Sequence, residues 1–277
     1  GYVVGVSGGV DSALTSTLCA ETGKPTLCLE LPISQQEDQV SRAQNHTSWL
    51  AQKYKNVEVK VVALDSLFDA FCSLDASAST NKNTTLSLAN TRSRLRMATL
   101  YYFASQRRSL VAGTGNKVED FGVGFYTKYG DGGVDLSPIA DLMKSEVRNL
   151  AAHFGVDQSI VNAAPTDGLW DDDRTDEDQL GASYDELEWA MQQQEKEKTK
   201  DDFVGRDRDV FFSESFHKIE AHPSGEITEY TECSNINNLS AVAKATAPPE
   251  PPSPVMMDIN GTRTCRHFSV DLAIASD

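Results

Sequence analysis

Short apolar runs recur along the first half of the chain and are rich in β-branched residues. They cover residues 2–6, 26–31, 57–63 and 110–113. We interpret them as lacking the clean alternation of apolar and polar positions that marks a half-exposed strand. Such runs are typical of strands buried on both faces of a parallel sheet, and we predict a strand at each of them.

Between these runs, apolar residues return at helical spacing in residues 11–22, 37–54 and 86–106. In the first segment Leu14 and Leu18 lie four positions apart, and Gly23 can end the helix. In the third segment we expect most apolar side chains to face inward, namely Leu95, Ala98, Leu100, Tyr102 and Phe103. This alternation predicts an α/β fold with a doubly wound, open parallel sheet flanked by helices. Ligands of such sheets bind beyond the carboxyl ends of the strands.

The second half of the chain contains two further predicted helices, over residues 141–154 and 183–198. From about residue 221 the hydrophobic periodicity stops, and residues 247–254 are rich in proline. We therefore predict one folded domain over residues 1–220 and a divergent, poorly ordered tail over residues 221–277. Because Gly1 leads directly into an apolar strand, we expect that residues upstream of it are missing.

Composition narrows the class of protein. The formal net charge is −16, which argues against nucleic acid as a partner. A phosphate-bearing ligand must then be held by local basic groups or backbone amides. No run approaches the roughly 20 apolar residues of a membrane span, so we expect no membrane partner. The five cysteines are scattered and form no C-x-x-C pair, which favours reduced thiols in a cytoplasmic protein over a zinc site.

The most informative segment follows the first predicted strand and opens the first predicted helix: Gly5, Val6, Ser7, Gly8, Gly9, Val10, Asp11 and Ser12. Paired glycines allow a tight turn that presents backbone amides to an anion, and the helix directs its N-terminal amides to the same place. The serine hydroxyls add donors, and the aspartate can hold a magnesium ion that bridges phosphates. The segment matches neither Walker A nor G-x-G-x-x-G. The alternative is a glycine-rich turn with a Ser or Asp helix cap.

Ser-Gly-Gly-x-Asp-Ser after a strand resembles the loop of the pyrophosphate-loop ATPases, which cleave ATP between the α and β phosphates. Further motifs follow at residues 90–97 (NTRSRLRM), 113–120 (GTGNKVED), 124–133 (GFYTKYGDGG), 135–138 (DLSP), 164–169 (APTDGL) and 180–185 (LGASYD). In this order, over about residues 1–217, they resemble the NAD synthetase family of ammonia-dependent type. That family has the adenine nucleotide alpha hydrolase-like fold.

The resemblance implies a ligase that uses ATP to amidate deamido-NAD with ammonia, and a homodimer that binds the dinucleotide near the subunit interface. Besides the loop, the residues implied to bind ATP are Thr114, Lys144 and Thr166. Magnesium would be held by Asp11 and Glu119. The residues implied to bind deamido-NAD are Arg94, Lys128, Asp135, His217 and Lys218. From Ile219 onward the chain departs from the family pattern.

We expect Asp11, Asp131 and Lys144 to take part in catalysis. A carboxylate is a poor acyl donor, but its attack on the α-phosphorus of ATP gives an acyl-adenylate whose leaving group is AMP. Ammonia then attacks the activated carbonyl. Asp131 is our candidate for removing a proton from ammonium, and the alternative is that it only shapes a glycine-rich turn.

Simpler interpretations stay open for several of these residues. Arg94 can belong to the solvated face of a basic helix, because Arg92, Arg94 and Arg96 cannot all point the same way. Lys128 can be an ordinary surface lysine, Lys144 a lysine in the first turn of a helix, and Thr166 a cap or turn residue.

Three further functions compete with the ammonia-dependent synthetase. The first is the synthetase domain of a glutamine-dependent form, and the second is a catalytically silent nucleotide-binding homologue. The third is a tRNA-thiolating enzyme with the same loop. The lack of paired cysteines and the acidic charge argue against tRNA thiolation.

Overall fold

The computed structural model describes residues 1–75, 82–170, 174–198 and 200–211. All of them belong to one compact unit that extends over Gly1–Ile236. The predicted domain boundary near residue 220 and the predicted tail lie outside the described residues and stay predictions.

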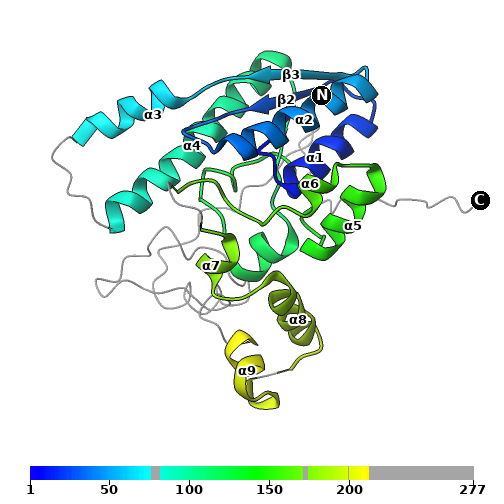
Figure 1. Cartoon of the computed structure of the whole chain (residues 1–277), viewed down its shortest axis with the longest axis vertical. Coiled ribbons are helices and arrows are strands. Elements are labelled where there is room, and N and C mark those ends of the chain that lie inside the picture. The colour runs from blue at the N-terminus through cyan, green and yellow to red at the C-terminus, as the bar shows by residue number, and fades with distance from the viewer. Residues whose placement is uncertain (76–81, 171–173, 199, 212–277) are drawn as a thin grey trace, which may run out of the picture. The chain divides into compact units, whose positions relative to one another are not determined.

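A parallel sheet lies among the helices of the first half of the chain (Figure 1). It contains β1 (Tyr2–Gly5), β2 (Thr26–Glu30), β3 (Val57–Val61) and β4 (Leu110–Ala112) in the order β3-β2-β1-β4. The register places Val3 of β1 opposite Leu27 of β2 and Val111 of β4. The chain thus moves outward from β1 to β3 and then returns to the other side of β1.

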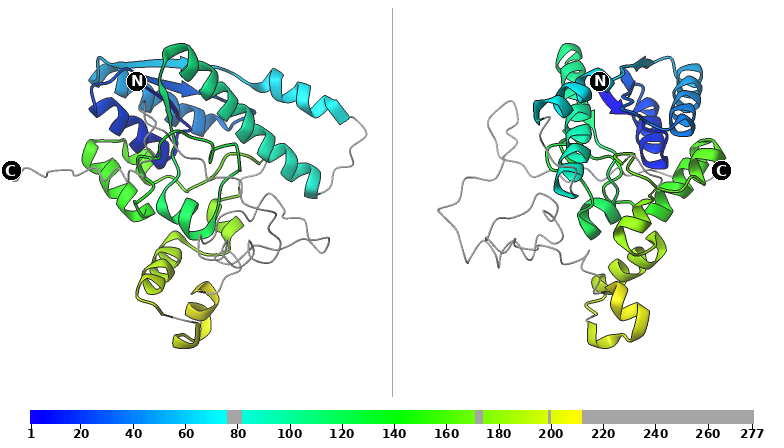
Figure 2. Two further views of the ribbon diagram at one scale, coloured as in Figure 1. Left: turned by 180° about the vertical axis from the view of Figure 1, so that it is seen from behind. Right: turned by 60° about the vertical axis from the view of Figure 1, so that its left-hand side comes forward.

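Helices cover both faces of this sheet, which confirms the doubly wound architecture (Figure 2). One face carries α1 (Val10–Glu21) and α2 (Glu37–Lys53), and the other carries α3 (Asp65–Cys72) and α4 (Lys82–Arg107). Neighbouring strand residues point to opposite faces. Val3 therefore joins the α4 side of the core with Leu95, whereas Val4 joins the α1 side with Cys19.

The rest of the described chain is a series of shorter elements. They are the 3-10 turn η1 (Ser73–Asp75), the π-helical segment η2 (Val118–Val123), α5 (Lys144–Phe154), α6 (Gln158–Val161), α7 (Asp176–Leu180), α8 (Tyr184–Glu195), the 3-10 turn η3 (Lys200–Asp202) and α9 (Gly205–Phe211). Helix α5 packs on α1 through Leu14, Val147 and Ala151. None of the described helices is long and apolar enough to cross a membrane.

Burial of the strands on both faces holds for β2, which is buried along its length, but the prediction is wrong for β3. Val61 of β3 is 54% exposed, and Glu58 and Lys60 point to solvent. The reason is position, since β3 is an edge strand and its sequence Val-Glu-Val-Lys-Val does alternate. At the opposite edge, Leu110 of β4 is also exposed.

Part of the inward face predicted for residues 86–106 is also wrong. Leu95 is buried, and Leu100 and Phe103 are half-buried, but Ala98 and Tyr102 are exposed. The last two lie four positions apart and share the outer face of α4. Helix α4 begins earlier than predicted, α5 begins later, and α3, α6, α7 and α9 were not predicted at all.

A buried histidine links the two helices on the α1 face. His46 of α2 is 2% exposed, and its Nε2 lies 3.0 Å from the hydroxyl of Ser16 in α1. Its ring packs against Trp49. Burial lowers the pKa of His46 to about 4, so the folded protein holds this ring neutral. His46 therefore has a packing role between the two helices.

Stability is expected to fall with acid because of His46. The unfolded chain protonates this ring near its ordinary pKa of 6.5 and the folded chain only near 4, so stability is lost as the pH falls across that window. The loss is on the order of 3 kcal/mol. We expect His46→Gln to remove this dependence in urea unfolding measured at several pH values.

The comparison has to be a difference between variant and wild type. Burial raises the pKa of Asp120 and Asp176 to about 7, and these carboxyls change stability in the opposite sense. His153→Gln is the matched control, because His153 is exposed on α5. A constant difference between His46→Gln and wild type across the pH range would contradict the prediction.

Candidate active site

The candidate site lies where the strand order reverses between β1 and β4. Loops that follow these two neighbouring strands leave the same edge of the sheet, which is where open α/β sheets bind ligands. A cavity of about 350 Å³ opens there. Its walls include the whole of residues 5–12 and, among the other predicted residues, Thr114, Glu119, Asp131, Lys144 and Thr166.

The loop between β1 and α1 is held in shape by its own hydrogen bonds. The Ser12 hydroxyl donates to the Gly9 carbonyl at 3.0 Å and accepts from the Ser7 amide at 3.1 Å. Gly8 has a φ of +90°. Gly9 is the N-cap of α1 and provides no side-chain cap, so the first amides of the helix face the cavity without one. The alternative of a simple Ser or Asp helix cap is therefore wrong.

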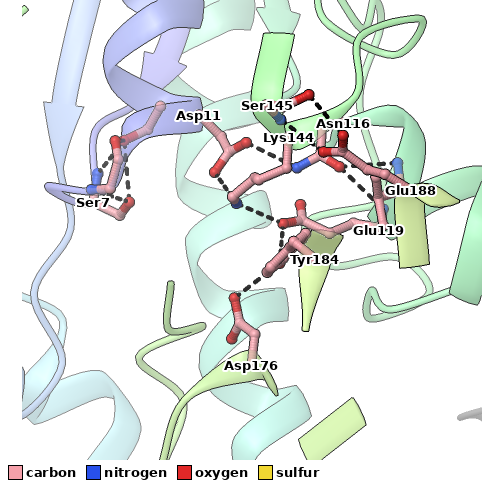
Figure 3. A network of polar contacts seen from close by, with 12 residues as sticks. Ser7, Asp11, Asn116, Glu119, Lys144, Ser145, Asp176, Tyr184 and Glu188 are labelled. Atoms are coloured by element: carbon pink, nitrogen blue, oxygen red, sulfur yellow. Dashed lines mark hydrogen bonds and ion pairs between the residues drawn. The ribbon is translucent and has the colours of Figure 1, made fainter. Parts of the chain in front are cut away.

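A buried lysine joins two carboxylates beside this loop (Figure 3). The Lys144 ammonium lies 2.6 Å from Asp11 Oδ2 and 2.8 Å from Glu119 Oε1. Lys144 is 2% exposed although it is the first residue of α5. Lys144 is thus a first-turn lysine, as the alternative interpretation has it, but its ammonium is buried between two carboxylates. The structure brings together the three charged side chains that the sequence assigned to metal and ATP.

Electrostatics keep this lysine charged. Burial alone would lower the pKa of Lys144, but the charges and hydrogen bonds of Asp11 and Glu119 outweigh it, so its pKa is raised. Desolvation, together with the nearby charge of Glu119, raises the pKa of Asp176 to about 7. The cluster is therefore a fixed cation set among several carboxyl groups.

Four further hydrogen bonds hold the cluster in place. Asn116 is fully buried and donates to Asp11 Oδ1 at 2.8 Å, while its carbonyl oxygen accepts the amides of Val118 and Glu119 at the start of η2. The Tyr184 hydroxyl donates to Glu119 Oε1 at 2.6 Å. These residues fall within the sequence motifs, but no role was predicted for them.

Asp131 sits at the opposite wall of the cavity. Its Oδ1 accepts from the Ser93 hydroxyl at 2.6 Å and from the Thr127 amide at 3.1 Å. Its own amide donates back to the Ser93 hydroxyl at 2.9 Å. Asp131 thus shapes the glycine-rich turn and also lines the cavity, so both of its predicted roles are compatible with this position.

The three neighbouring arginines of α4 diverge, as their spacing predicted. Arg92 donates to the Leu169 carbonyl at 2.6 Å, and Arg94 donates to the Lys128 carbonyl at 3.1 Å. Arg96 donates to the Leu31 carbonyl at 3.0 Å and lines the cavity. Its Nη2 is buried and has no hydrogen-bond partner among the described residues. No role was predicted for Arg96, although the R-x-R-x-R spacing implied that the three arginines cannot all point the same way.

Three of the residues predicted to bind deamido-NAD, Arg94, Lys128 and Asp135, are not among the residues that line this cavity. Arg94 and Lys128 adjoin each other through the hydrogen bond from the Arg94 guanidinium to the Lys128 carbonyl. Asp135 accepts the Val111 amide at 2.8 Å and the Tyr101 hydroxyl at 3.0 Å at the edge of β4. His217 and Lys218 lie outside the described residues.

Thr166 takes part in a local turn. Its hydroxyl donates to the Arg174 carbonyl at 3.4 Å and accepts the Gly168 amide at 3.3 Å. Since it also lines the cavity, the turn places a hydroxyl there. Thr114 also lines the cavity, in the turn that follows β4.

The donor set suits a hard divalent cation. Asp11 and Glu119 converge on one point, where both contact the Lys144 ammonium. Magnesium is usually bound by one or two carboxylates together with substrate phosphates and water. The described residues hold no cluster of three or more His, Cys, Asp or Glu side chains arranged around one point. The two carboxylates thus fit a metal that shares its remaining ligands with a phosphate.

Comparison with protein families assigns the chain. The model of the family described as NAD synthase matches residues 1–221. This chain belongs to the NAD synthase family. The chain has 277 residues, and the match includes every residue that the structure describes.

Individual relatives agree with this family. The chain is 38% identical over 208 residues to the NH(3)-dependent NAD(+) synthetase of Carboxydothermus hydrogenoformans, covering 74% of this chain and 82% of the relative. It is 36% identical over 234 residues to the enzyme of the same name from Archaeoglobus fulgidus, covering 83% and 90% of the two chains.

Solved structures support the fold. NMN synthetase from Francisella tularensis matches with a TM-score of 0.65 and 32% identity, over 78% of this chain and 85% of that one. The NH3-dependent NAD synthetase of Campylobacter jejuni matches with a TM-score of 0.58 and 27% identity, over 76% and 80%. The predicted fold class is confirmed.

Gly8→Ala is expected to disable the loop. A Cβ on Gly8 would lie 2.4 Å from the carbonyl oxygen of Gln39, and the φ of +90° is strained for any residue with a side chain. The loop must then move, and we expect ATP affinity to fall more than about tenfold in titration calorimetry, or about 1.4 kcal/mol.

Gly23→Ala provides the matched control for this loss. Gly23 has a φ of +70° and follows the far end of α1, but a Cβ there meets nothing within 4 Å. Its substitution is expected to lower stability by about 1–2 kcal/mol and to leave ATP binding unchanged. Equal ATP affinity in both variants would show that the shape of the loop does not matter.

Proposed function

We propose that this protein amidates deamido-NAD to NAD with ammonia and ATP, through an acyl-adenylate, and releases AMP and pyrophosphate. The observation that carries the proposal is the Lys144 ammonium, buried between Asp11 and Glu119 beside the uncapped start of α1. This arrangement presents a fixed positive charge and free amides to a polyphosphate. The names of the relatives give the nitrogen donor, ammonia, and the product, NAD.

Adenylation is the first step. A carboxylate oxygen of the nicotinate ring attacks the α-phosphorus of ATP, the bond from that phosphorus to the bridging oxygen breaks, and pyrophosphate leaves with the electron pair. The loop amides, Ser7, Ser12 and Lys144 bind the leaving pyrophosphate as its charge develops. Thr114 and Thr166 also line the cavity, and their hydroxyl groups would add further contacts to the phosphates. These contacts become stronger as negative charge develops on the departing pyrophosphate, so they favour cleavage of the bond.

Magnesium fits the same corner of the cavity. Asp11 and Glu119 would hold it, and when bound it would neutralise phosphate charge and orient the departing group. Lys144 would share the two carboxylates with the metal.

Amidation is the second step. Ammonia attacks the carbonyl carbon of the acyl-adenylate, the bond from carbonyl carbon to phosphate oxygen breaks, and AMP leaves. A proton must be lost from the attacking nitrogen. Asp131 lines the cavity and is held by Ser93 and the Thr127 amide, which supports it as the acceptor of that proton.

The cytoplasm is the compartment that we propose for this reaction. Cys19 and Cys28 are buried free thiols, and Cys72 is an exposed one. Burial raises the pKa of both buried thiols to about 12, so they behave as inert core residues. Free thiols of this kind are typical of reducing compartments.

Product analysis tests the proposed reaction. With deamido-NAD, ATP, magnesium and ammonia, we expect AMP, pyrophosphate and NAD in equal amounts. Asp11→Asn should reduce turnover by about 100-fold, because it removes a carboxylate shared by the metal and Lys144. Asp69→Asn, which changes an exposed residue of α3, is the control and should leave turnover unchanged.

Several results would reject the reaction. ADP and phosphate as products would exclude adenylation, and ATP binding without turnover would favour the silent homologue. Glutamine as a better donor than ammonia would favour the glutamine-dependent form. Because one structural relative is an NMN synthetase, the mononucleotide analogue of deamido-NAD is the informative competing substrate. Faster turnover of that analogue would reject deamido-NAD as the preferred substrate.

We also propose that the protein is a homodimer. Leu67 and Phe71 of α3 and Leu74 of η1 are 45%, 43% and 78% exposed, and together they form an apolar surface. Helix α3 extends beyond the end of the sheet in Figure 1. A second copy that covers this surface would remove it from water. Arg94 and Lys128 lie off the cavity wall, which supports a dinucleotide site completed by a second subunit.

Phe71→Glu is expected to weaken this dimer, because it places a charge in an apolar interface. Sedimentation velocity at two protein concentrations should show dimers for wild type and a shift of at least about tenfold in the dissociation constant for the variant. Val204→Glu is the matched control, since Val204 is an 84% exposed apolar residue elsewhere. A monomeric wild type would contradict the proposal, and an unchanged Phe71→Glu dimer would exclude this surface.

A further inference from the structure

Helix α8 lies against both segments that carry the charged cluster. Its apolar face packs on η2, which bears Glu119, through Leu187 and Met191 in a core shared with Val118 and with Met143, the residue before α5. Gly122 of η2 approaches Met191 so closely that a Cβ would lie 2.6 Å from its sulfur. Lys117, just before η2, pairs with Glu195 at the end of α8 at 2.6 Å. The helix therefore bridges η2 and the start of α5.

Tyr184 provides the first polar contact from this helix to the cluster. It is 1% exposed, and its hydroxyl donates to Glu119 Oε1 at 2.6 Å. The Lys144 ammonium lies 4.6 Å from the centre of its ring. The same hydroxyl lies 3.3 Å from Asp176 Oδ2. One side chain thus contacts the carboxylate, the ammonium and a second acid at once (Figure 3).

Glu188 provides the second contact, one turn further along α8. Its carboxylate accepts the Ser145 amide at 2.7 Å and the Ser145 hydroxyl at 2.6 Å. Ser145 is the second residue of α5 and follows Lys144 directly. A carboxylate at a helix N-terminus binds amides that have no partner within the helix and complements the helix dipole. Glu188 therefore fixes the backbone from which the Lys144 side chain departs.

Packing alone does not require these polar groups. A phenylalanine at 184 would fill the same space, and the N-terminus of α8 already has its own cap, in which Ser183 pairs with Glu186. A buried carboxylate such as Glu188 is costly unless each oxygen is hydrogen-bonded. Tyr184 and Glu188 are four positions apart and share one helix face. From this face Tyr184 reaches Glu119, and Glu188 reaches Ser145, which follows Lys144.

We propose that α8 is a positioning element for the reaction, in which Tyr184 orients Glu119 and Glu188 orients Lys144. Neither residue touches the substrate, and both act through the pair that binds metal and pyrophosphate. The proposal rests on the proposed function of this cavity and adds to it the residues that set its geometry.

Variants of α8 test the proposal in the full chain. Tyr184→Phe and Glu188→Ala should lower kcat by about 10- to 100-fold, while KM for deamido-NAD stays unchanged. Tyr184→Phe should keep the melting temperature near that of wild type, because the ring still packs. Glu188→Gln should recover part of the activity lost in Glu188→Ala, because its amide oxygen can still accept the Ser145 amide.

Glu186→Gln is the matched control on the same helix. Glu186 pairs with Arg206 at 2.7 Å and caps α8, but it does not contact the cluster. This variant should lose stability and keep the kcat of wild type. An equal kcat in Tyr184→Phe and wild type would overturn the proposal. It would also be overturned if Glu186→Gln lost as much activity as Glu188→Ala.

Calorimetry separates failure of the proposal from failure of the function. If wild type forms no NAD, the proposed function fails whatever the variants do. Binding of pyrophosphate with magnesium then decides the role of α8. An affinity about tenfold weaker in Tyr184→Phe supports positioning, and an unchanged affinity overturns it.

Discussion

The buried ammonium of Lys144 is the interaction on which the site depends. A lysine taken out of water needs carboxylates around it, and here they come from the first turn of α1 and from η2. The three segments are joined at one point, although Asp11 and Lys144 are 133 positions apart in the chain. Removing either carboxylate leaves the buried ammonium with a single partner, so the cluster also favours the correct packing of α5 against α1.

Strand order decides where this cluster can form. The loop after β1 and the turn after β4 are neighbours only because the chain returns past β1 after completing β3. Both loops leave the carboxyl edge of a parallel sheet, where the amides at the start of α1 are also directed. A polyphosphate meets the positive end of the helix dipole and backbone amides there. These local contacts offset the repulsion from a protein with a net charge of −16.

Neutral side chains hold the carboxylates of the candidate site in place. Asn116 holds Asp11, Ser93 holds Asp131, and Tyr184 holds Glu119. Each of these partners is neutral, so it orients a carboxylate without cancelling its charge. The α8 contacts extend the same arrangement to the backbone of α5. Such support explains how short polar side chains from loops keep a fixed geometry.

Local structure that depends on neighbouring residues could be predicted from the amino-acid sequence alone. Val3 and Val4 lie in a strand, Gly8 and Gly9 form a tight loop, and this loop opens a helix, because backbone preference and apolar spacing act over a few positions. The family motifs also identified Asp11, Glu119 and Lys144. The exposed edge at Val61 and the outward face of Ala98 and Tyr102 depend on what packs beside them, and local patterns do not contain that information.

The pairing of side chains that are far apart in the sequence could be seen only in the folded structure. Tyr184 and Glu119 are 65 positions apart, and Ser93 and Asp131 are 38 apart. Their hydrogen bonds require η2, α4 and α8 to be placed to within a fraction of a bond length. That placement results from the packing of whole apolar faces, such as the core shared by Val118 and Leu187. The short motifs of this protein therefore specify which side chains the site contains, while contacts between elements far apart in the chain set the distances between them.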